Sequence, residues 1–519
     1  MLKHRIISVN GLLIPMILGG YIANSLFTAA IGFSQDFTKI RRSVFKIRVV
    51  SQEPNFERPW EHESSKKSSG TGFYIGNNLI LTNAHVVANS RYLTVQRDGD
   101  SNLELAAVVH IAHDCDLAVI TTQRKNYFQG IAPLSFGSLP KLRSPVSTIG
   151  FPKGGEQLSI TEGIVSRVGY RSYVHSRVNK HLLVQVDSAI NPGNSGGPVV
   201  QKDKVVGVAF QSFISAENTG YIIPTPVILR FLKDIEDGHY DGHIQSGLQV
   251  SPWAVSNSAN KLYYDLNDDS YGVVVSYVYP WSSLNRYIKK GDLLLKIDGN
   301  QIGADGKIDF QGERVNFDLA YDLRQLGDSI HFVLKRGREV RKFNVKIEKN
   351  RSHYFKGSQY IRRPKYYIYG GLVFSTLSYN FLKSWGNKWY ERVPAILKYL
   401  HYNSDLDMQF ATDEEFIVLV DRLPHSINAY LTKQENEVVE AVNGQRVNSL
   451  QRLATILDSL KSEYVKIEFM GDVEPAVMRT SDVAASKNEI LSQYKVDRDR
   501  WLIGDEMDGA NLIKTGDKK

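Results

Sequence analysis

The sequence predicts a mainly β protein whose first half folds as barrels and whose second half holds two related α/β modules. Residues 42–232 consist of short β-like runs, such as NLILTNAHVV and HLLVQVD, separated by Gly, Asn and Asp turns. Many short strands with such turns are typical of an all-β barrel or sandwich. In the second half, the same succession of predicted strands, helix and turn occurs twice. In the first half, a histidine, an aspartate and a serine follow one another along the chain.

Length and composition indicate a globular protein with several domains. The 519 residues suggest about three or four domains. Hydrophobic residues make up 42% and charged residues 23%, as in ordinary globular proteins. The net charge of +8 is spread along the chain without a nucleic-acid-binding signature, so we expect no nucleic-acid partner. Cys115 is the single cysteine, and no Cys/His spacing indicates a metal site, so we expect no metal and no cofactor.

Residues 1–34 have the composition of a targeting segment. Lys3 and Arg5 open the chain, and no further Asp, Glu, Lys or Arg occurs before Asp36. We interpret this as a cleaved signal peptide for export. An uncleaved membrane anchor is the alternative, because the uncharged run exceeds the roughly 20 residues that span a bilayer, and a buried helix is a third. The first two predict a periplasmic location, with membrane contact only if the leader stays uncleaved.

The internal repeat compares GVVVSYVYPWSSLNRYIKKGDLLLKIDGNQI, from 272, with FIVLVDRLPHSINAYLTKQENEVVEAVNGQRV, from 416. Each copy has a β run, a proline (Pro280 or Pro424), a short helix, a second β run and a D/N-G turn at 298–299 or 443–444. Two related modules therefore follow the first half. A helix should precede them in TPVILRFLKDIEDG, whose apolar residues at helical spacing are Val227, Ile228, Phe231, Leu232 and Ile235.

A glycine-rich turn, SAINPGNSGGPVV, surrounds Ser195. GNSGG fits the nucleophile elbow of α/β-hydrolases and also the nucleophile turn of chymotrypsin-like proteases. Chain order separates the two, because the chymotrypsin arrangement runs His, Asp, Ser. His85 follows a β run and Asp116 directly precedes LAVI. This order predicts a double β-barrel in which the first barrel supplies His85 and Asp116 and the second supplies Ser195.

The chemistry explains these residue types. A serine hydroxyl needs a base to take its proton, and an imidazole titrates near neutral pH. An aspartate beside that imidazole fixes its tautomer. The backbone N–H groups of Gly193 and Ser195 would then bind the oxyanion. Taken singly, His85 is a surface or core histidine, Asp116 a turn residue and Ser195 part of a glycine turn. Asp114 is a rival for the acid role.

Three motifs carry a family resemblance. GTGFYIGNNLILTNAHVV, DCDLAVI and AINPGNSGGPVV resemble the Deg/HtrA family of serine proteases, which have a chymotrypsin/trypsin-like double β-barrel, and the repeated modules resemble PDZ domains, the second divergent. The resemblance implies an ATP-independent endopeptidase that degrades misfolded or damaged proteins, binds peptide termini and forms a homotrimer or larger oligomer. We expect a protease domain at 35–240, PDZ-like domains at 241–350 and 357–480, and a tail at 481–519.

The resemblance also suggests substrate contacts at Ala189, Ile190 and Gln211. Ala189 lies six residues before the serine, where trypsin-like enzymes that cut after Arg or Lys have an aspartate. Asp187 is close in sequence, but two residues along a strand. We therefore expect cleavage after small or medium apolar residues.

In the first PDZ-like module, Gly247, Leu248 and Gln249 lie where the family's carboxylate-binding loop would be. Gln249 replaces the usual glycine or hydrophobic pattern, which weakens the case for peptide capture. The second module has KQENEVV where the first has KKGDLLL, and its lost glycine favours a role in assembly.

Three alternatives stay open at this stage. A chaperone or scaffold would bind unfolded proteins with little proteolysis. An α/β-hydrolase esterase would need alternating strands and long helices, which residues 42–210 lack. Cys115 is interpreted as a small buried apolar residue, with a redox switch beside the acid as its alternative.

Overall fold

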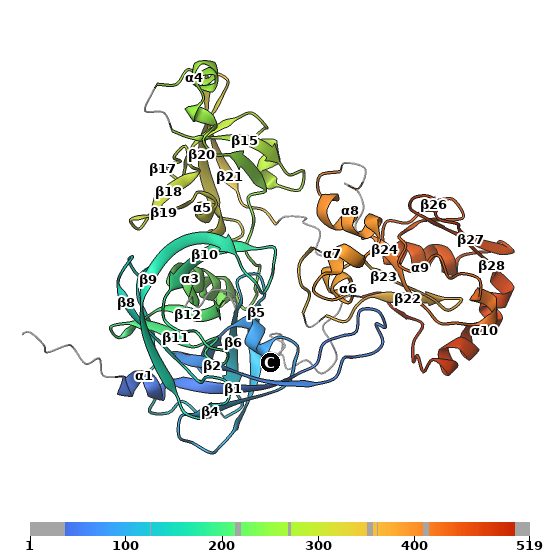
Figure 1. Cartoon of the computed structure of the whole chain (residues 1–519), viewed down its shortest axis with the longest axis horizontal. Helices are drawn as coiled ribbons and strands as arrows, with labels where there is room; N and C mark the ends of the chain where they lie inside the picture. The colour runs from blue at the N-terminus through green and yellow to red at the C-terminus, as the bar shows by residue number, and fades with distance from the viewer. Residues whose placement is uncertain are drawn as a thin grey trace, which may run out of the picture.

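The computed structural model describes residues 37–124, 126–212, 220–267, 271–349, 356–360, 362–407, 410 and 415–503, without the side chains of residues 211 and 212. The predicted leader at 1–34 and the end of the predicted tail, 504–519, lie outside these residues. Within the described ranges, each helix is too short or too polar to cross a bilayer. Figure 1 shows two packed barrels with the first module above them and the second to the right.

The first barrel is closed in the order β1-β2-β3-β6-β5-β4. Its alternating apolar residues, such as Phe45, Ile47 and Val49 on β1, point into a separate core. The strands are β1 (Val44–Ser51), β2 (Lys66–Gly76), β3 (Leu79–Thr82), β4 (Ser90–Arg97), β5 (Glu104–Ala112) and β6 (Leu117–Thr122). Two short helices flank them, α1 (Thr38–Arg42) and α2 (Ala84–Val87).

The second barrel runs β11-β8-β9-β10-β13-β12 and closes through the pairing of β11 with β12. The strands are β8 (Pro145–Gly150), β9 (Ser159–Ser172), β10 (Lys180–Val186), β11 (Pro198–Gln201), β12 (Lys204–Ser212) and β13 (Gly220–Pro224), with β7 (Ser135–Phe136) beside β12. The predicted helix is α3 (Thr225–Asp234), and Val227, Ile228 and Phe231 are buried on one face of it.

The first module is a sheet in the order β14-β15-β16-β20-β21. Its elements are β14 (Leu248–Ser251), α4 (Ser258–Tyr264), β15 (Val273–Val278), β16 (Leu293–Ile297), β17 (Asn300–Gln301), β18 (Lys307–Phe310), β19 (Glu313–Asn316), α5 (Asp318–Asp322), β20 (Ser329–Arg336) and β21 (Glu339–Lys346). One hydrophobic core continues from the second barrel into this module through Ile235, Ile244 and Leu248.

The second module has two sheets, β24-β23-β22-β29 and β26-β25-β27-β28. The strands are β22 (Tyr366–Tyr369), β23 (Leu372–Thr376), β24 (Ile417–Arg422), β25 (Val439–Val442), β26 (Gln445–Arg446), β27 (Tyr464–Phe469), β28 (Ala476–Arg479) and β29 (Arg500–Trp501). The helices are α6 (Tyr379–Lys383), α7 (Trp389–Arg392), α8 (Ala395–Asn403), α9 (Leu450–Asp458) and α10 (Thr480–Gln493). Because α10 packs against this module and β29 pairs with β22, residues 481–501 are folded where we expected a tail.

The two copies of the sequence repeat have the same backbone conformation at their D/N-G turns. The turns at 298–299 and 443–444 both have two consecutive residues with positive φ, 45° and 78° in the first and 46° and 74° in the second. This is the type I′ geometry that joins two antiparallel strands, and Asp-Gly and Asn-Gly are its preferred pairs. The turns connect β16 to β17 and β25 to β26.

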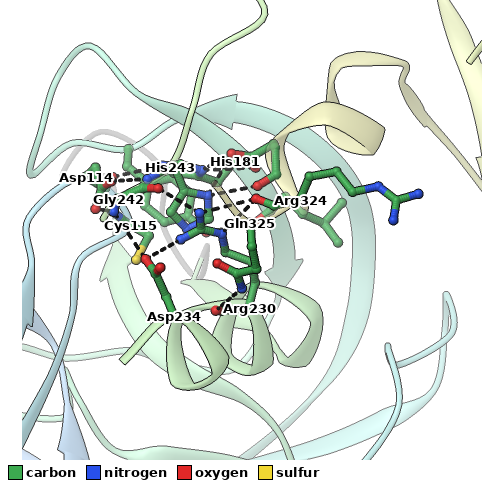
Figure 2. A network of polar contacts seen from close by, with 12 residues as sticks. Asp114, Cys115, His181, Arg230, Asp234, Gly242, His243, Arg324 and Gln325 are labelled. Carbon is green, nitrogen blue, oxygen red and sulfur yellow. Dashed lines mark hydrogen bonds and ion pairs between the residues drawn. The ribbon is translucent and has the colours of Figure 1, made fainter. Parts of the chain in front are cut away.

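A buried polar network joins the second barrel to the first module (Figure 2). His181 on β10 contacts the Asp322 carboxylate on α5 through Nδ1, at 3.0 Å, and the Asp114 carbonyl oxygen through Nε2, also at 3.0 Å. Both partners are acceptors, so the ring carries a proton on each nitrogen and is cationic. Nearby, Arg230 on α3 binds Asp234 and the Gly242 carbonyl oxygen.

Asp322→Ala should unfold the protein at a lower urea concentration, because it leaves the buried His181 cation without its counter-ion. Breaking a buried pair from one side costs about 3–5 kcal/mol of the free energy of unfolding. Glu339→Ala, which removes a solvent-exposed partner of Arg341, should cost less than about 1 kcal/mol. Equal midpoints for both variants in a urea titration would contradict the assigned charge.

Candidate active site

The three residues predicted for catalysis lie where the barrels meet. His85 is in α2, directly after β3, and Asp116 directly precedes β6. Ser195 lies in the turn between β10 and β11 of the second barrel. The Thr71 N–H on β2 of the first barrel donates to the Ser195 carbonyl oxygen, at 2.9 Å. A first-barrel strand therefore holds the serine turn of the second barrel.

His85 and Asp116 form a close pair. His85 Nδ1 lies 2.6 Å from Asp116 Oδ2, and the His85 main-chain N–H donates to Oδ1 at 2.7 Å. Asp116 is fully buried and has a positive φ of 53°, a conformation that is uncommon outside glycine, although aspartate adopts it more often than most residues. The Asn83 side-chain amide donates to the Asp116 carbonyl oxygen at 2.9 Å and stabilises that backbone. The carboxylate thus fixes the tautomer and orientation of the imidazole.

The electrostatics of the pair suit a base and its orienting acid. Burial alone would raise the pKa of Asp116, but the positive charge available at His85 and the two hydrogen bonds from His85 outweigh it, so the pKa is lowered. Burial alone would lower the pKa of His85, yet the charge of Asp116 and the hydrogen bond to it raise that pKa above 6.5. His85 is therefore a stronger base than a free imidazole.

Asp114, the rival acid, faces another way. Its carboxylate accepts from the main-chain N–H groups of Cys115 and His243, at 2.9 and 2.8 Å, and from the Tyr240 hydroxyl. It belongs to the network that reaches the first module (Figure 2).

Cys115 between the two aspartates is fully buried, and burial raises the pKa of its thiol well above the ordinary value. Such a thiol is unreactive, which favours the apolar interpretation.

Steric contact explains the glycines around Ser195. A Cβ atom at Gly193, where φ is 100°, would lie 2.4 Å from the Phe151 carbonyl oxygen. A Cβ atom at Gly196 would lie 2.1 Å from the Thr71 carbonyl oxygen. Any larger residue would therefore displace the turn.

The turn also presents two free donors. Among the described residues, no hydrogen bond engages the main-chain N–H of Gly193 or of Ser195, whereas the N–H groups of Asn194 and Gly196 bind Asn191 and Ala209. Thr71 Oγ1 donates to the Gly193 carbonyl oxygen at 2.7 Å and fixes that peptide. Two unpaired N–H groups on a fixed turn can stabilise an oxyanion.

The Ser195 hydroxyl is not bonded to the imidazole here. It donates to the Phe210 carbonyl oxygen at 3.3 Å, and no Ser195–His85 hydrogen bond occurs within the described part of the chain. Catalytic hydrogen bonds in unliganded enzymes are often long and tighten only when substrate binds. A rotation about the Ser195 Cα–Cβ bond is needed to free the hydroxyl for His85.

The predicted substrate contacts are brought together only in part. The Ala189 carbonyl oxygen accepts from Thr161 Oγ1 at 3.2 Å, while the Ile190 side chain is buried in the core. Gln211 lies in β12, but its side chain is outside the described residues. The Asp187 carboxylate accepts from the Ile164 main-chain N–H. This hydrogen bond fixes one of its two oxygens beside β9.

The predicted PDZ loop begins at Gly247, whose φ is 65° and whose Cβ would lie 2.8 Å from the Trp281 ring. Leu248 is buried, and the Gln249 amide donates to the Tyr279 hydroxyl at 2.7 Å. β14 pairs with β15 on one side and lies at the edge of its sheet. An edge strand can accept a peptide as an added strand.

One group has the spacing of metal ligands. His181, His243 and Asp322 place one ligand atom each within 4.8 Å of one another, and all three are buried. The hydrogen bonds already described engage both nitrogens of His181 with oxygen acceptors, and His243 Nδ1 lies 2.8 Å from Asp322 Oδ1. His181 and Asp322 therefore form a hydrogen-bonded ion pair, while His243 Nε2 is buried without a hydrogen-bond partner among the described residues.

Sequence reasoning missed three residues that shape this site. Asn83 and Thr71 lie inside the motifs LTNAHVV and GTGFYIG, so their proximity to His85 and the barrel strand could have drawn attention to them. His175, with its Nε2 atom 4.0 Å from Asp116 Oδ1, lies in a connection between strands. No local pattern signals its position.

Comparisons with known proteins agree with this architecture. A family model for a trypsin-like peptidase domain matches residues 70–208, and one for a PDZ domain matches residues 355–501. Protease Do-like 4, mitochondrial, of Arabidopsis thaliana is 33% identical over 88% of this chain and 84% of its own length. Serine protease DegP homolog of Plasmodium falciparum is 27% identical over 90% of this chain and 68% of its own. The solved HtrA-type protease AlgW with decapeptide has a TM-score of 0.46 and 20% identity, covering 61% of this chain and 98% of that one.

The fold, the peptidase match and these relatives define a trypsin-fold serine endopeptidase followed by PDZ domains. The chain belongs to the Deg/HtrA family. The predicted fold class, a double β-barrel followed by two PDZ-like modules, is thereby confirmed.

The periplasmic location predicted from residues 1–34 is wrong. The relatives include Protease Do-like 4, mitochondrial, and Protease Do-like 2, chloroplastic, both of Arabidopsis thaliana; the second is 31% identical over 88% of this chain and 74% of its own length. These names point to an organelle. A segment that lacks acidic residues and begins with basic ones is common to export signals and organelle transit peptides.

The raised pKa of His85 predicts how the activity depends on pH. The base must be neutral to accept the serine proton, so kcat/KM should rise with pH through a midpoint above 6.5. Asp116→Asn should lower both the midpoint and the rate, the latter by about 10⁴-fold. The matched change Asp114→Asn should leave the midpoint in place. A pH–rate profile in which Asp114→Asn, and not Asp116→Asn, moves the midpoint would reverse the assignment.

Proposed function

We propose that this chain hydrolyses peptide bonds in unfolded or damaged proteins through the triad His85, Asp116 and Ser195. The observation that carries the proposal is the 2.6 Å contact between His85 and Asp116 on the first barrel, together with the Ser195 turn of the second barrel, where the Gly193 and Ser195 N–H groups have no hydrogen-bond partner among the described residues. A protein that only binds unfolded chains would need neither a raised imidazole pKa nor free donors at a fixed turn. The scaffold alternative is therefore not favoured.

The mechanism follows from the positions of these groups. Ser195 Oγ, turned from Phe210 toward the imidazole, attacks the scissile carbonyl carbon while His85 Nε2 takes its proton. Asp116 stabilises the imidazolium that forms. The Gly193 and Ser195 N–H groups bind the developing oxyanion, and each such donor contributes about 10²–10³ in rate. His85 then gives the proton to the leaving amine, and water repeats the sequence on the acyl-enzyme.

Specificity should favour small or medium apolar residues before the cleaved bond. Ala189 offers no charge at the position where enzymes that cut after Arg or Lys have an aspartate, and the Asp187 carboxylate is held beside β9 by the Ile164 N–H. Unfolded proteins expose Val, Ala and Leu, so this preference fits substrates that have lost their structure. Capture of a peptide terminus by the edge strand β14 would raise the local substrate concentration. A homotrimer or a larger assembly is proposed with it, from the family resemblance.

The test is digestion of an unfolded model protein by the purified chain, with fragments mapped by mass spectrometry. The wild type should cut after Val, Ala or Leu. Ser195→Ala should yield no fragments, although it should still bind the unfolded protein. Fragments ending in Arg or Lys would overturn the specificity. Equal fragmentation by Ser195→Ala would overturn the triad.

A further inference from the structure

A second imidazole lies beside the proposed catalytic acid. His175 belongs to the connection between β9 and β10, and 8% of its surface is exposed. Its Nε2 atom is 4.0 Å from Asp116 Oδ1 and 2.9 Å from His113 Nδ1. The His175 and His85 rings are 6.1 Å apart. Nothing in the triad mechanism uses this residue.

The contacts of His175 fix its protonation state. Burial lowers the pKa of His175 to about 4 and that of His113 to about 3, so both rings are neutral at physiological pH. Two nitrogens 2.9 Å apart then share one proton. An unprotonated His175 Nε2 would place its partial negative charge 4.0 Å from the Asp116 carboxylate, which is electrostatically unfavourable. We therefore assign the proton to His175 Nε2, with His113 Nδ1 as the acceptor.

This N–H group is donated to His113, and it places its partial positive charge 4.0 Å from Asp116 Oδ1 without a hydrogen bond to it. It stabilises the ionised carboxylate without adding a second cation that would compete with His85 for it. Asp116 Oδ1, the oxygen 4.0 Å from His175 Nε2, accepts the His85 main-chain N–H at 2.7 Å, so His175 acts on the oxygen that holds the histidine backbone. Preorganised dipoles in a buried site act more strongly than in water.

Tyr360 covers both histidines from outside the peptidase barrels. Its ring stacks on His175 with centroids 4.2 Å apart and planes at 19°, and on His113 at 4.4 Å and 23°. Its hydroxyl donates to the His175 carbonyl oxygen at 2.9 Å. Tyr360 therefore holds both the ring and the backbone of His175.

The second PDZ domain holds Tyr360 in place. Tyr360 precedes β22, the first strand of that domain. The neighbouring Gln359 exchanges two hydrogen bonds with the Asn380 side chain on α6, at 2.7 and 3.0 Å. A Cβ atom at Gly357 would lie 3.0 Å from Val178, so this segment packs closely on the connection that carries His175. The Arg177 guanidinium lies 5.3 Å from the centre of the Tyr379 ring, also on α6.

We propose that His175 and Tyr360 are positioning residues for the hydrolysis reaction. Through them, the segment that leads into the second PDZ domain helps to fix the position and charge state of the catalytic acid, Asp116. Within the described residues, no hydrogen bond or ring contact joins either side chain to the serine turn. They act through Asp116, which orients His85. The inference rests on the triad proposed above and adds a role for the second module beyond assembly.

The first test compares two variants of His175. The glutamine amide nitrogen occupies a position close to that of imidazole Nε2, so His175→Gln keeps an N–H donor beside Asp116. His175→Leu keeps bulk but loses the donor. For a short peptide substrate, we expect His175→Leu to lower kcat about 10- to 100-fold with KM unchanged, and His175→Gln to recover most of that loss. Equal losses in both variants would indicate packing alone and would overturn the role of the N–H.

The second test concerns Tyr360. Tyr360→Ala removes the stacking and the hydrogen bond and should slow kcat about 10-fold without changing KM, whereas Tyr360→Phe keeps the stacking and should lose much less. Tyr430→Ala is the matched control, because Tyr430 is 94% exposed and lies in the same domain. Thermal unfolding of each variant checks that the fold is retained.

A fluorophosphonate probe, which reacts only with an activated serine, separates this inference from the function it rests on. We expect the wild type to be labelled at Ser195, and Tyr360→Ala and His175→Leu to be labelled about 10-fold more slowly. Wild-type labelling rates in both variants would overturn the positioning role and leave the triad standing. An unlabelled wild type would overturn both.

Discussion

The buried carboxylate of Asp116 is the constraint on which the active site depends. An ionised group without solvent contact persists only where hydrogen bonds replace water, and here His85 supplies two of them. The left-handed backbone at Asp116 costs about 1–3 kcal/mol and persists only because its surroundings over-determine it. The Asn83 amide binds the Asp116 carbonyl oxygen, and two residues earlier the Asp114 carboxylate accepts the His243 main-chain N–H of the first module. The position of the base follows from this one side chain.

The rest of the site depends on contact between the barrels. Thr71, on a strand of the first barrel, binds the Gly193 carbonyl oxygen through its hydroxyl and the Ser195 carbonyl oxygen through its N–H. The oxyanion donors are thus held by the barrel that does not carry them. Glycine at 193 and 196 permits this close approach, because any Cβ atom there would overlap main-chain oxygens. The glycine-rich motif is required by packing as much as by the turn itself.

Local chemistry explains what could be predicted from the sequence. Strand alternation, helical spacing in α3 and the Asp-Gly and Asn-Gly turns depend on neighbouring residues, and the order of His85, Asp116 and Ser195 distinguished a double barrel from an α/β-hydrolase. Contacts between distant segments leave no such pattern. The bond from Tyr360 to His175 joins residues 185 positions apart, and the pairing of β29 with β22 joins the end of the second module to its beginning. The helix α10 buries few apolar residues, so its sequence has no clear apolar face that would predict packing. Residues 481–501 therefore resembled a tail.

The central claim is that Ser195 is a nucleophile activated by His85 and oriented, through it, by Asp116. Intact-mass spectrometry of the chain after reaction with a fluorophosphonate, followed by peptide mapping, tests it most directly. The account predicts one adduct, on the peptide that contains Ser195, and its loss in His85→Ala. An adduct on another residue, or labelling of Ser195 that survives His85→Ala at the wild-type rate, would contradict it.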